Sequence, residues 1–257
     1  MGCSRPNNNK KDGSPRFCVD YCALNKLTTK DIYPLPRIDG TLDRLSGANY
    51  FTSLDAASGY WQVPVYEAHR SKTAFITHYG LHQFKVMPFG LCNAPATFQR
   101  MMDILLLGMN WKFCMAYIDD IVIFSKTFEQ HLQHLKLVFE KLMSINLTLK
   151  FSKCFFFRTQ FRYLGHVVSS RGVSTDPAKI IAVKNAPSPT NLTELRSWIS
   201  LLGYYRRFIR NFSKIAAPLR LLLKADQPFV WGPPQQAAFE SLRDRLISAP
   251  ILAYPRF

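Results

Sequence analysis

Acidic residues are scarce in this chain of 257 residues. Its 17 Asp and Glu stand against 33 Lys and Arg, which gives a formal net charge of +16 and a pI near 9.8. Such a charge favours a polyanionic partner, because phosphate backbones attract basic surfaces whatever their sequence. Aromatic residues make up 14% and are interleaved with the basic ones, which favours nucleic acid. Charge alone leaves a generic basic protein as the alternative.

Long hydrophobic runs are missing as well. No stretch of about 18 apolar residues is present, so no transmembrane helix is expected. The chain begins with Met1-Gly2-Cys3-Ser4-Arg5-Pro6, which lacks the apolar core of a signal peptide and fits a myristoylation motif poorly. We therefore expect an intracellular protein with no membrane residence. The hydrophobic content of 47% excludes a disordered basic tail and indicates a substantial core.

Metal-binding cysteine patterns are absent, since no C-x-x-C pair and no cluster with zinc-site spacing occurs. The six cysteines are Cys3, Cys18, Cys22, Cys92, Cys114 and Cys154. A chain of this length needs no disulfides, so we expect reduced thiols. His131 and His134 lie three residues apart, and we expect them on the exposed flank of an amphipathic helix rather than as metal ligands.

Internal repeats are also lacking, and strands and helices are mixed with hairpins, which predicts an α+β fold. Strands are predicted at residues 16–21, 51–55, 61–65, 73–77, 113–117, 121–124 and 161–167. Helices are predicted to begin near Pro95, Thr127, Asn191 and Gln235, and residues 187–189 to form a linker. Helical spacing predicts three inward faces. The first has Phe98, Met101, Met102 and Leu105, the second Leu132, Leu135, Phe139 and Leu142, and the third Leu195, Trp198, Ile199, Leu202 and Tyr205.

Three of the few acids stand at the ends of predicted strands. Asp55 ends one apolar strand, and Asp119 and Asp120 occupy the tight turn between two others. Carboxylates that lie close together need a cation, and Mg²⁺ prefers oxygen ligands, keeps waters and engages phosphates. Two such ions about 3.5–4 Å apart would form a site for in-line phosphoryl displacement. The alternative is that Asp55 is a cap and Asp119-Asp120 a solvated turn.

The acids lie in two of a series of motifs. Tyr117-Ile118-Asp119-Asp120 and residues 54–60 (LDAASGY) resemble the Y-x-D-D box and the first acidic motif of reverse transcriptases. Other segments follow in the family's order: residues 17–26 (FCVDYCALNK) of the fingers, 86–99 (VMPFGLCNAPATFQ), 163–166 (YLGH) of the primer grip and 202–209 (LGYYRRFI) of the thumb. The Phe-Gly-Leu-x-Asn-Ala-Pro form is similar to gypsy-type long-terminal-repeat retrotransposons. The resemblance covers roughly residues 10–257.

The resemblance implies a right-hand polymerase with fingers, an antiparallel-sheet palm and a helical thumb. A partial fingers region would span residues 1–30, palm 31–62, fingers 63–92, palm 93–178 and thumb 179–225. Residues 226–257 would be the truncated start of a connection or ribonuclease H-like region. Residues 1–9 are polar where the family has an apolar strand, so the first fingers strands are expected to be missing or replaced. Cys22 and Cys92 also depart from the family pattern.

The resemblance also implies roles for individual residues. Asp55, Asp119 and Asp120 would bind two Mg²⁺ ions, with Mn²⁺ as a substitute and the backbone of Ala56 as a further ligand. Tyr60 would stack under the sugar and exclude a ribose 2′-hydroxyl, a packed core aromatic being the alternative. The other nucleotide-binding residues would be Lys10, Lys11, Arg16, Ala57 and Phe89. Primer and template would be contacted by Tyr117, Leu164, Gly165, His166, Arg206 and Arg207.

The implied function is RNA-directed DNA synthesis, in which deoxynucleotides are added to a primer 3′-hydroxyl by two-metal phosphoryl transfer. The partners would be an RNA or DNA template-primer, deoxynucleoside triphosphates and the rest of a Pol polyprotein: ribonuclease H, integrase and protease. The protein would act in the cytoplasm, in a virus-like particle, or in the nucleus. The alternative is an inactive nucleic-acid-binding remnant of a decayed element. Tyr60 argues against a template-directed RNA polymerase, and the sequence leaves the oligomeric state open.

Overall fold

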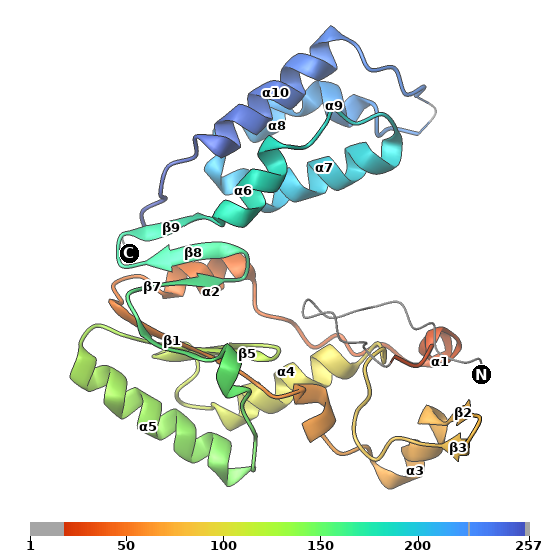
Figure 1. Ribbon diagram of the computed structural model, residues 1–257, viewed down its shortest axis with the longest axis vertical. Helices are drawn as coiled ribbons and strands as arrows, with labels where there is room; N and C mark the ends of the chain where they lie inside the picture. Colours follow the sequence, from red (N-terminus) through yellow and green to blue (C-terminus); the bar gives the residue numbers. More distant parts are fainter. Residues whose placement is uncertain (1–17, 226, 255–257) are drawn as a thin grey trace. The chain divides into compact units, whose positions relative to one another are not determined.

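The structure is a computed structural model that describes residues 18–225 and 227–254. The chain divides into two compact units between Thr159 and Gln160. Each unit combines helices with antiparallel strands (Figure 1), which confirms the predicted α+β class. None of the described helices is long and apolar enough to cross a membrane.

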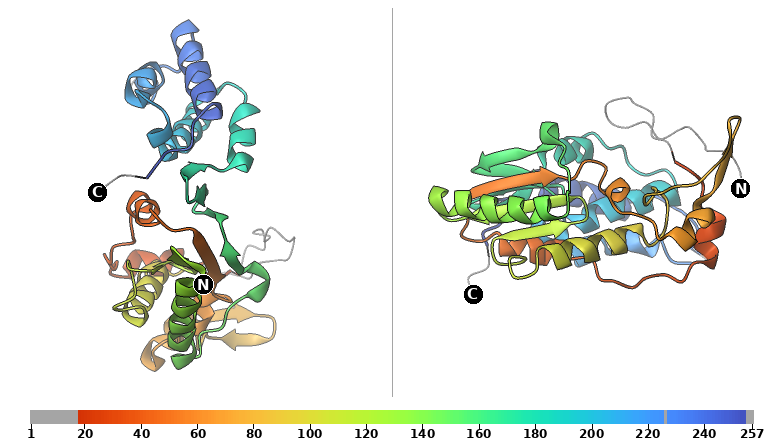
Figure 2. Two further views of the ribbon diagram at one scale, coloured as in Figure 1. Left: turned by 90° about the vertical axis from the view of Figure 1, so that its left-hand side faces the viewer. Right: turned by 90° about the horizontal axis from the view of Figure 1, so that it is seen from below.

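The first unit is built around a four-stranded antiparallel sheet. Its strand order is β4 (Cys114–Tyr117), β5 (Asp120–Ser125), β1 (Tyr50–Asp55) and β6 (Phe155–Arg158). Helices α4 (Ala94–Leu105) and α5 (Phe128–Ser144) lie along one face of this sheet (Figure 2). The core between sheet and helices includes Leu54, Phe98, Met102, Ile121, Leu135 and Leu142. The strands predicted at 51–55, 113–117 and 121–124 and the helices predicted to begin near Pro95 and Thr127 are therefore present.

Helix α5 begins as predicted, because the Thr127 side chain accepts a hydrogen bond from the Gln130 backbone N–H at 3.3 Å. Its buried face differs from the prediction. His131, Leu135, Val138 and Leu142 face the core, whereas Leu132 is 48% exposed. The expectation that His131 lies on an exposed flank is wrong, since its ring is completely buried. The ring lies within hydrogen-bond distance of polar side chains of the sheet. The spacing of hydrophobic residues in the sequence gives no sign of such contacts.

The rest of the first unit consists of short elements. They are α1 (Cys22–Leu27), α2 (Ile38–Arg44), η1 (Gly59–Gln62), α3 (Glu67–Arg70), η2 (Ser71–Thr73), β2 (Phe75–Thr77), β3 (Gly80–His82) and η3 (Phe151–Lys153). The predicted strand at 61–65 is wrong, because the segment starts as a 3₁₀ helix and only Pro64 forms an isolated bridge, to Val86. Residues 18–21 are not a strand either, since Tyr21 is the N-cap of α1 and its hydroxyl donates to the Thr73 carbonyl at 3.0 Å.

The second unit starts with the antiparallel sheet β7 (Gln160–Tyr163), β8 (His166–Ser169) and β9 (Gly172–Thr175). The single strand predicted at 161–167 is wrong, because Leu164 and Gly165 form a two-residue turn between β7 and β8. At Gly172, φ is +139°, and a Cβ there would lie 2.1 Å from the carbonyl oxygen of Leu252. Only glycine allows the strand to pair with residues near the end of the chain.

Helices complete the second unit: α6 (Pro177–Lys184), α7 (Leu192–Tyr204), η4 (Arg206–Phe208), α8 (Phe212–Ile215), α9 (Ala217–Leu221) and α10 (Pro233–Ile247). The predicted cap of α7 is confirmed, since Asn191 accepts from the Glu194 N–H at 3.0 Å. Trp198 of α7 packs on Phe239 of α10 with ring centroids 4.6 Å apart. Residues 187–189 lie outside helices and strands, as a linker should. The boundaries of fingers, palm and thumb stay predictions.

Candidate active site

A row of polar side chains crosses three strands of the first unit. Tyr117 of β4 pairs with Asp120 of β5, and Asp120 pairs with Asp55 of β1. Directly opposite residues of antiparallel strands point to the same face of a sheet. Leu54 and Ile121, one residue away, point to the opposite face and into the core under α4 and α5. The row therefore lies on the face that these two helices leave open.

The turn between β4 and β5 consists of Ile118 and Asp119. Ile118 has φ +53°, a strained conformation for a β-branched residue. The buried Gln99 of α4 holds this turn from both sides. Its Oε1 accepts from the Ile118 N–H at 2.8 Å and its Nε2 donates to the Ala116 carbonyl at 3.0 Å. The turn that carries Asp119 is thus fixed by Gln99, the last residue of the 86–99 motif, for which the sequence analysis predicted no role.

The Asp119 carboxylate is pressed into the protein. Its Oδ1 is buried without a hydrogen-bond partner, and a Cβ at Gly59 would lie 2.4 Å from it. Burial raises the pKa of Asp119 to about 6, with further contributions from the nearby charges of Asp120 and Asp55. The pKa of Asp120 is raised by burial and then by Asp55. Glycine at 59 is therefore what leaves room for a carboxylate at this point.

The ammonium group of Lys153 compensates the carboxylates. Lys153 Nζ lies 3.0 Å from Asp55 Oδ2 and lowers the pKa of both Asp119 and Asp120. It comes from η3, 98 residues from Asp55 in the chain. Sequence reasoning missed Lys153, because one lysine among many in a basic chain gives no signal. The folded chain brings it to the acids.

The donor set fits a hard divalent cation. Asp55, Asp119 and Asp120 offer only oxygen ligands, and the unpartnered Asp119 Oδ1 is the kind of atom that a metal ion satisfies. Across residues 18–225 and 227–254, no three His, Cys, Asp or Glu side chains are placed to hold one ion together. Asp55 instead pairs with Lys153. Metal binding by the three acids and by the Ala56 backbone stays a prediction.

Two of the predicted nucleotide-binding residues lie together beside the acids. The Tyr60 ring, in η1, lies 5.4 Å from that of Phe89 and 5.7 Å from that of Phe98. Burial, and then the charge of Asp119, raises the pKa of the Tyr60 phenol to about 12. Tyr60 therefore packs against the core and also lies near Asp119. The packing expected of a core aromatic is confirmed, and the role of Tyr60 under the sugar stays a prediction.

The backbone after Asp55 is already engaged. The Ala56 N–H donates to the Asp119 carbonyl at 3.1 Å, and the Ala57 N–H donates to the Thr148 carbonyl at 3.0 Å. Gln62 reinforces this contact by donating to the Ala57 and Thr148 carbonyls and accepting from the Thr148 N–H. A phosphate bound at the Ala57 amide would have to replace its present partner. Lys10, Lys11 and Arg16 lie outside the described residues.

A buried polar network supports the sheet from its other face. His131 bridges the strands, with Nε2 2.7 Å from Thr52 Oγ1 and Nδ1 2.9 Å from Ser125 Oγ. Ser125 Oγ also lies 2.7 Å from His134 Nδ1. Burial lowers the pKa of His131 to about 4, and His134 contributes to the shift. The neutral His131 ring thus ties β1 to β5, the strands that carry Asp55 and Asp120.

The predicted primer-grip residues form the β7–β8 turn of the second unit. Leu164 and Gly165 have φ of +45° and +68°, as in the type I′ turn of tight hairpins. The Gly165 carbonyl accepts from the Tyr205 hydroxyl at 2.6 Å, and the Leu164 carbonyl accepts from the Tyr204 hydroxyl. The Leu164 carbonyl also lies 2.8 Å from His166 Nδ1, which must therefore carry the proton.

Two arginines predicted to contact the primer or template lie in the second unit as well. Arg206 and Arg207 begin η4, directly after the two tyrosines that hold the β7–β8 turn. Arg206 is exposed and Arg207 half-buried. His166, by contrast, is buried against the rings of Tyr204, Tyr205 and Phe208. Of these residues, Arg206 is therefore the one freely presented for a phosphate.

Comparisons with known proteins agree with these motifs. Residues 8–168 match the family described as reverse transcriptase (RNA-dependent DNA polymerase). The chain is 42% identical over 94% of its length to the Pol polyprotein of transposon 297 and 37% identical over 95% to that of transposon gypsy, both from Drosophila melanogaster. It spans about a quarter of the length of these relatives, 23% and 25%.

Solved structures give the same result. A foamy viral protease-reverse transcriptase in complex with ds DNA superposes with a TM-score of 0.89 at 27% identity, over 96% of this chain and 44% of that one. The same viral protein in complex with an RNA/DNA hybrid gives 0.83, over 95% and 33%. The polymerase fold and the gypsy-type resemblance predicted from the motifs are confirmed. The chain therefore belongs to the reverse transcriptase (RNA-dependent DNA polymerase) family.

Proposed function

We propose that this chain is the polymerase segment of a longer Pol polyprotein and that it extends a primer 3′-hydroxyl with deoxynucleotides on RNA or DNA templates. The row of Tyr117, Asp120 and Asp55, with Asp119 in the adjoining turn, carries the proposal. Two carboxylates on the open face of the sheet and a third, partly buried one in the adjoining turn, with Lys153 as counter-charge, suit phosphoryl transfer better than a structural role. Buried or paired acids of a purely structural site would be fully satisfied.

The acids Asp55, Asp119 and Asp120 would hold two Mg²⁺ ions, next to the backbone of Ala56. Bound in such a site, divalent ions lower the pKa of the attacking hydroxyl and stabilise the charge of the leaving pyrophosphate. Other residues of the chain orient these carboxylates and keep them ionised. Gln99 fixes the turn that carries Asp119, and Lys153 favours the ionised carboxylates.

The nucleotide, and the template with its primer, would each be held by their own set of residues. Tyr60 and Phe89, side by side near Asp119, suit the sugar of a deoxynucleotide. Lys10, Lys11, Arg16 and the Ala57 amide would contact the triphosphate. Template and primer would engage Tyr117, Leu164, Gly165, His166, Arg206 and Arg207. The foamy viral relative was solved with ds DNA and with an RNA/DNA hybrid, which supports this class of ligand.

An inactive nucleic-acid-binding remnant is the second candidate. Two observations favour it: Asp55 is paired with Lys153 instead of joining a three-residue metal set, and the Ala57 amide is already bonded to Thr148. A charge of +16 would keep such a remnant on nucleic acid even without catalysis. Both candidates bind nucleic acid, and they differ only in whether the chain extends a primer.

Primer extension by the purified chain separates the candidates. Extension is measured on RNA and DNA templates with Mg²⁺, with Mn²⁺ and with chelator, beside the variant Asp119→Asn. The proposal expects metal-dependent extension that Asp119→Asn abolishes. Template-primer binding, followed by fluorescence anisotropy at two salt concentrations, should persist in the variant and weaken with salt. Binding without extension in the wild-type chain would establish the remnant, and neither binding nor extension would overturn both.

A further inference from the structure

One carboxylate on α4 contacts the amide that holds the catalytic turn. Asp103 lies one helical turn after Gln99, and its Oδ1 accepts from Gln99 Nε2 at 3.1 Å. The same Nε2 donates to the Ala116 carbonyl, while Gln99 Oε1 accepts from the Ile118 N–H. Gln99 is therefore satisfied on all sides within a buried site.

A glutamine amide has two orientations of nearly the same shape, related by exchange of its oxygen and nitrogen. Only one of them suits the turn, because Ile118 presents a donor and Ala116 an acceptor. In the exchanged orientation, the Gln99 oxygen would face both the Ala116 carbonyl and the Asp103 carboxylate. These three acceptor groups would repel one another, and the Ile118 N–H would face the Gln99 NH₂ group and lack an acceptor. The Asp103 carboxylate thus selects the orientation that the turn needs.

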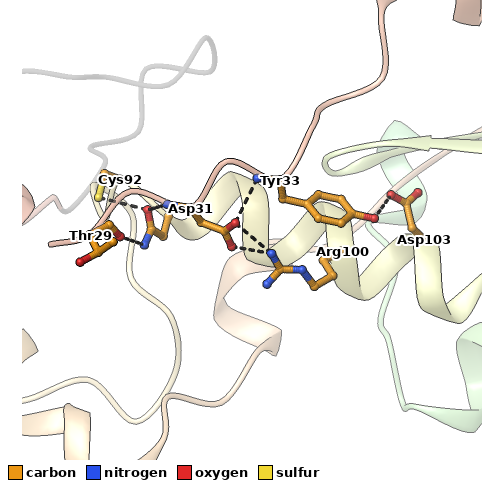
Figure 3. Close-up of polar contacts among 7 residues, drawn as sticks. Thr29, Asp31, Tyr33, Cys92, Arg100 and Asp103 are labelled. Carbon is orange, nitrogen blue, oxygen red and sulfur yellow. Dashed lines mark hydrogen bonds and ion pairs between the residues drawn. The ribbon is translucent and has the colours of Figure 1, made fainter.

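Asp103 is itself held from two sides. Its Oδ2 accepts from the Tyr33 hydroxyl at 2.7 Å and its Oδ1 from Asn110 Nδ2 at 2.9 Å. Tyr33 belongs to an extended segment that lies along α4 and is fastened there by Asp31, which pairs with Arg100 (Figure 3). The rotamer of Asp103 is therefore fixed independently of Gln99.

We propose that Asp103 is a positioning residue of the polymerase: by orienting the Gln99 amide it holds the Ile118-Asp119 turn in its strained conformation. Asp103 touches no reacting atom, and its effect passes through Gln99 to the turn. The expected effect of Asp103 on nucleotide incorporation rests on the proposed function. Its expected effect on the conformation of the turn rests only on the contacts made by α4.

The test compares Asp103→Ala with Asp31→Asn. Both remove a carboxylate that joins the 31–33 segment to α4, but Asp31 does not contact Gln99. Single-nucleotide incorporation, template-primer affinity and hydrogen exchange of the Ile118 amide by NMR are measured. We expect Asp103→Ala to slow incorporation by about tenfold and to speed Ile118 exchange by a similar factor, with affinity unchanged within about twofold. Asp31→Asn should leave all three within about twofold.

A second pair of variants keeps the volume of the site. Gln99→Glu places a second carboxylate beside Asp103 and should slow incorporation by about tenfold or more. Adding Asp103→Asn gives the new carboxylate a donor and should recover at least about threefold of the loss, whereas adding Asp31→Asn should recover none. This recovery reports on the contact itself and decides the matter even where Asp103→Ala fails to fold.

Two results overturn the inference. One is an Ile118 exchange rate in folded Asp103→Ala that stays within about twofold of the wild type. The other is an equal effect of Asp31→Asn, which would make the anchoring of the 31–33 segment the cause. A wild-type chain that extends no primer would refute the polymerase proposal alone, because Ile118 exchange still decides whether Asp103 holds the turn.

Discussion

Two tight hairpins, each with a tyrosine before a two-residue turn, behave in opposite ways. In the β4–β5 turn, Ile118 is strained and the Asp119 carboxylate has an oxygen without a partner. In the β7–β8 turn, Leu164 and Gly165 both have positive φ, and their carbonyls are bonded to tyrosine hydroxyls. The first turn has a β-branched residue at positive φ and retains an unsatisfied charge, which is typical of a chemical site. The second is satisfied, which is typical of a scaffold that presents its backbone.

This contrast predicts different consequences of substitution. Changes around the first turn should alter chemistry, charge and pH response. Changes in the second should alter stability within the second unit. Variants in and around each of the two turns therefore test whether the turns differ in this way.

The largest effect is expected at Tyr60, beside Asp119. Tyr60→Ala should raise the incorporation of ribonucleotides relative to deoxyribonucleotides by about tenfold or more, because loss of a steric clash opens room for a 2′-hydroxyl. The loss of ring packing should cost up to about 3–5 kcal/mol, so unfolding must be measured together with the kinetics. Tyr66→Ala, at a ring that is 75% exposed, is the control. A folded Tyr60→Ala with unchanged sugar selectivity would show that the ring only packs.

The next effect is the pH response of the sheet beneath the first turn. Burial lowers the pKa of His131 to about 4 from an ordinary value of 6.5, so the ring is neutral in the fold. Between pH 6.5 and 4 the unfolded chain binds a proton that the folded chain does not, and stability falls as the pH falls. The loss attributable to His131 should approach about 3 kcal/mol at pH 4 and vanish above pH 6.5.

Chemical denaturation of wild type and His131→Gln across this pH range measures that loss. The glutamine can still bond to Thr52 or Ser125 but does not titrate, so the difference between the two proteins isolates the imidazole from the acids nearby. Parallel pH profiles would show that His131 does not carry the response.

A smaller effect is expected in the second turn. Gly165→Ala places a side chain at φ +68°, where its Cβ would lie 3.3 Å from the Tyr205 hydroxyl oxygen. The variant should lose about 1–2 kcal/mol of unfolding free energy. Gly203→Ala, in α7 with open space around the new Cβ, should be neutral or gain about 0.5–1 kcal/mol. Equal effects of the two variants would show that the positive φ at Gly165 does not require glycine.

The smallest effect is expected at Lys153. Lys153→Met removes the counter-charge of Asp55 and should lower the free energy of unfolding in chelator slightly, by less than about 1 kcal/mol for such an exposed pair. Mg²⁺ should restore more stability to this variant than to wild type, because the carboxylates then lack the ammonium group of Lys153. Lys150→Met removes an equal charge from the same segment and is the control. An equal response to Mg²⁺ in Lys153→Met and wild type would show that Lys153 does not compete with an ion for Asp55, Asp119 and Asp120.

The sequence by itself determined the strands and helices that have clear local signals. The apolar strand before Asp55, the Thr127 and Asn191 caps and the spacing of Phe98 and Met102 express preferences of the chain within a few residues. The motif order also fixed the family, because the residue types of a reaction recur at fixed spacing. Local signals failed at 61–65 and 161–167, where a 3₁₀ turn and a hairpin turn depend on contacts with distant segments.

Tertiary structure alone decided how the candidate site is held. Gln99, Lys153 and His131 come from three elements far apart in the chain, and each acts on the strands or the turn that carry the acids. A glutamine in a helix, a lysine in a basic chain and a histidine next to an apolar face each have an ordinary explanation in sequence. Their partners exist only once the sheet has formed, because hydrogen bonds and ion pairs act over a few ångströms of space rather than along the chain.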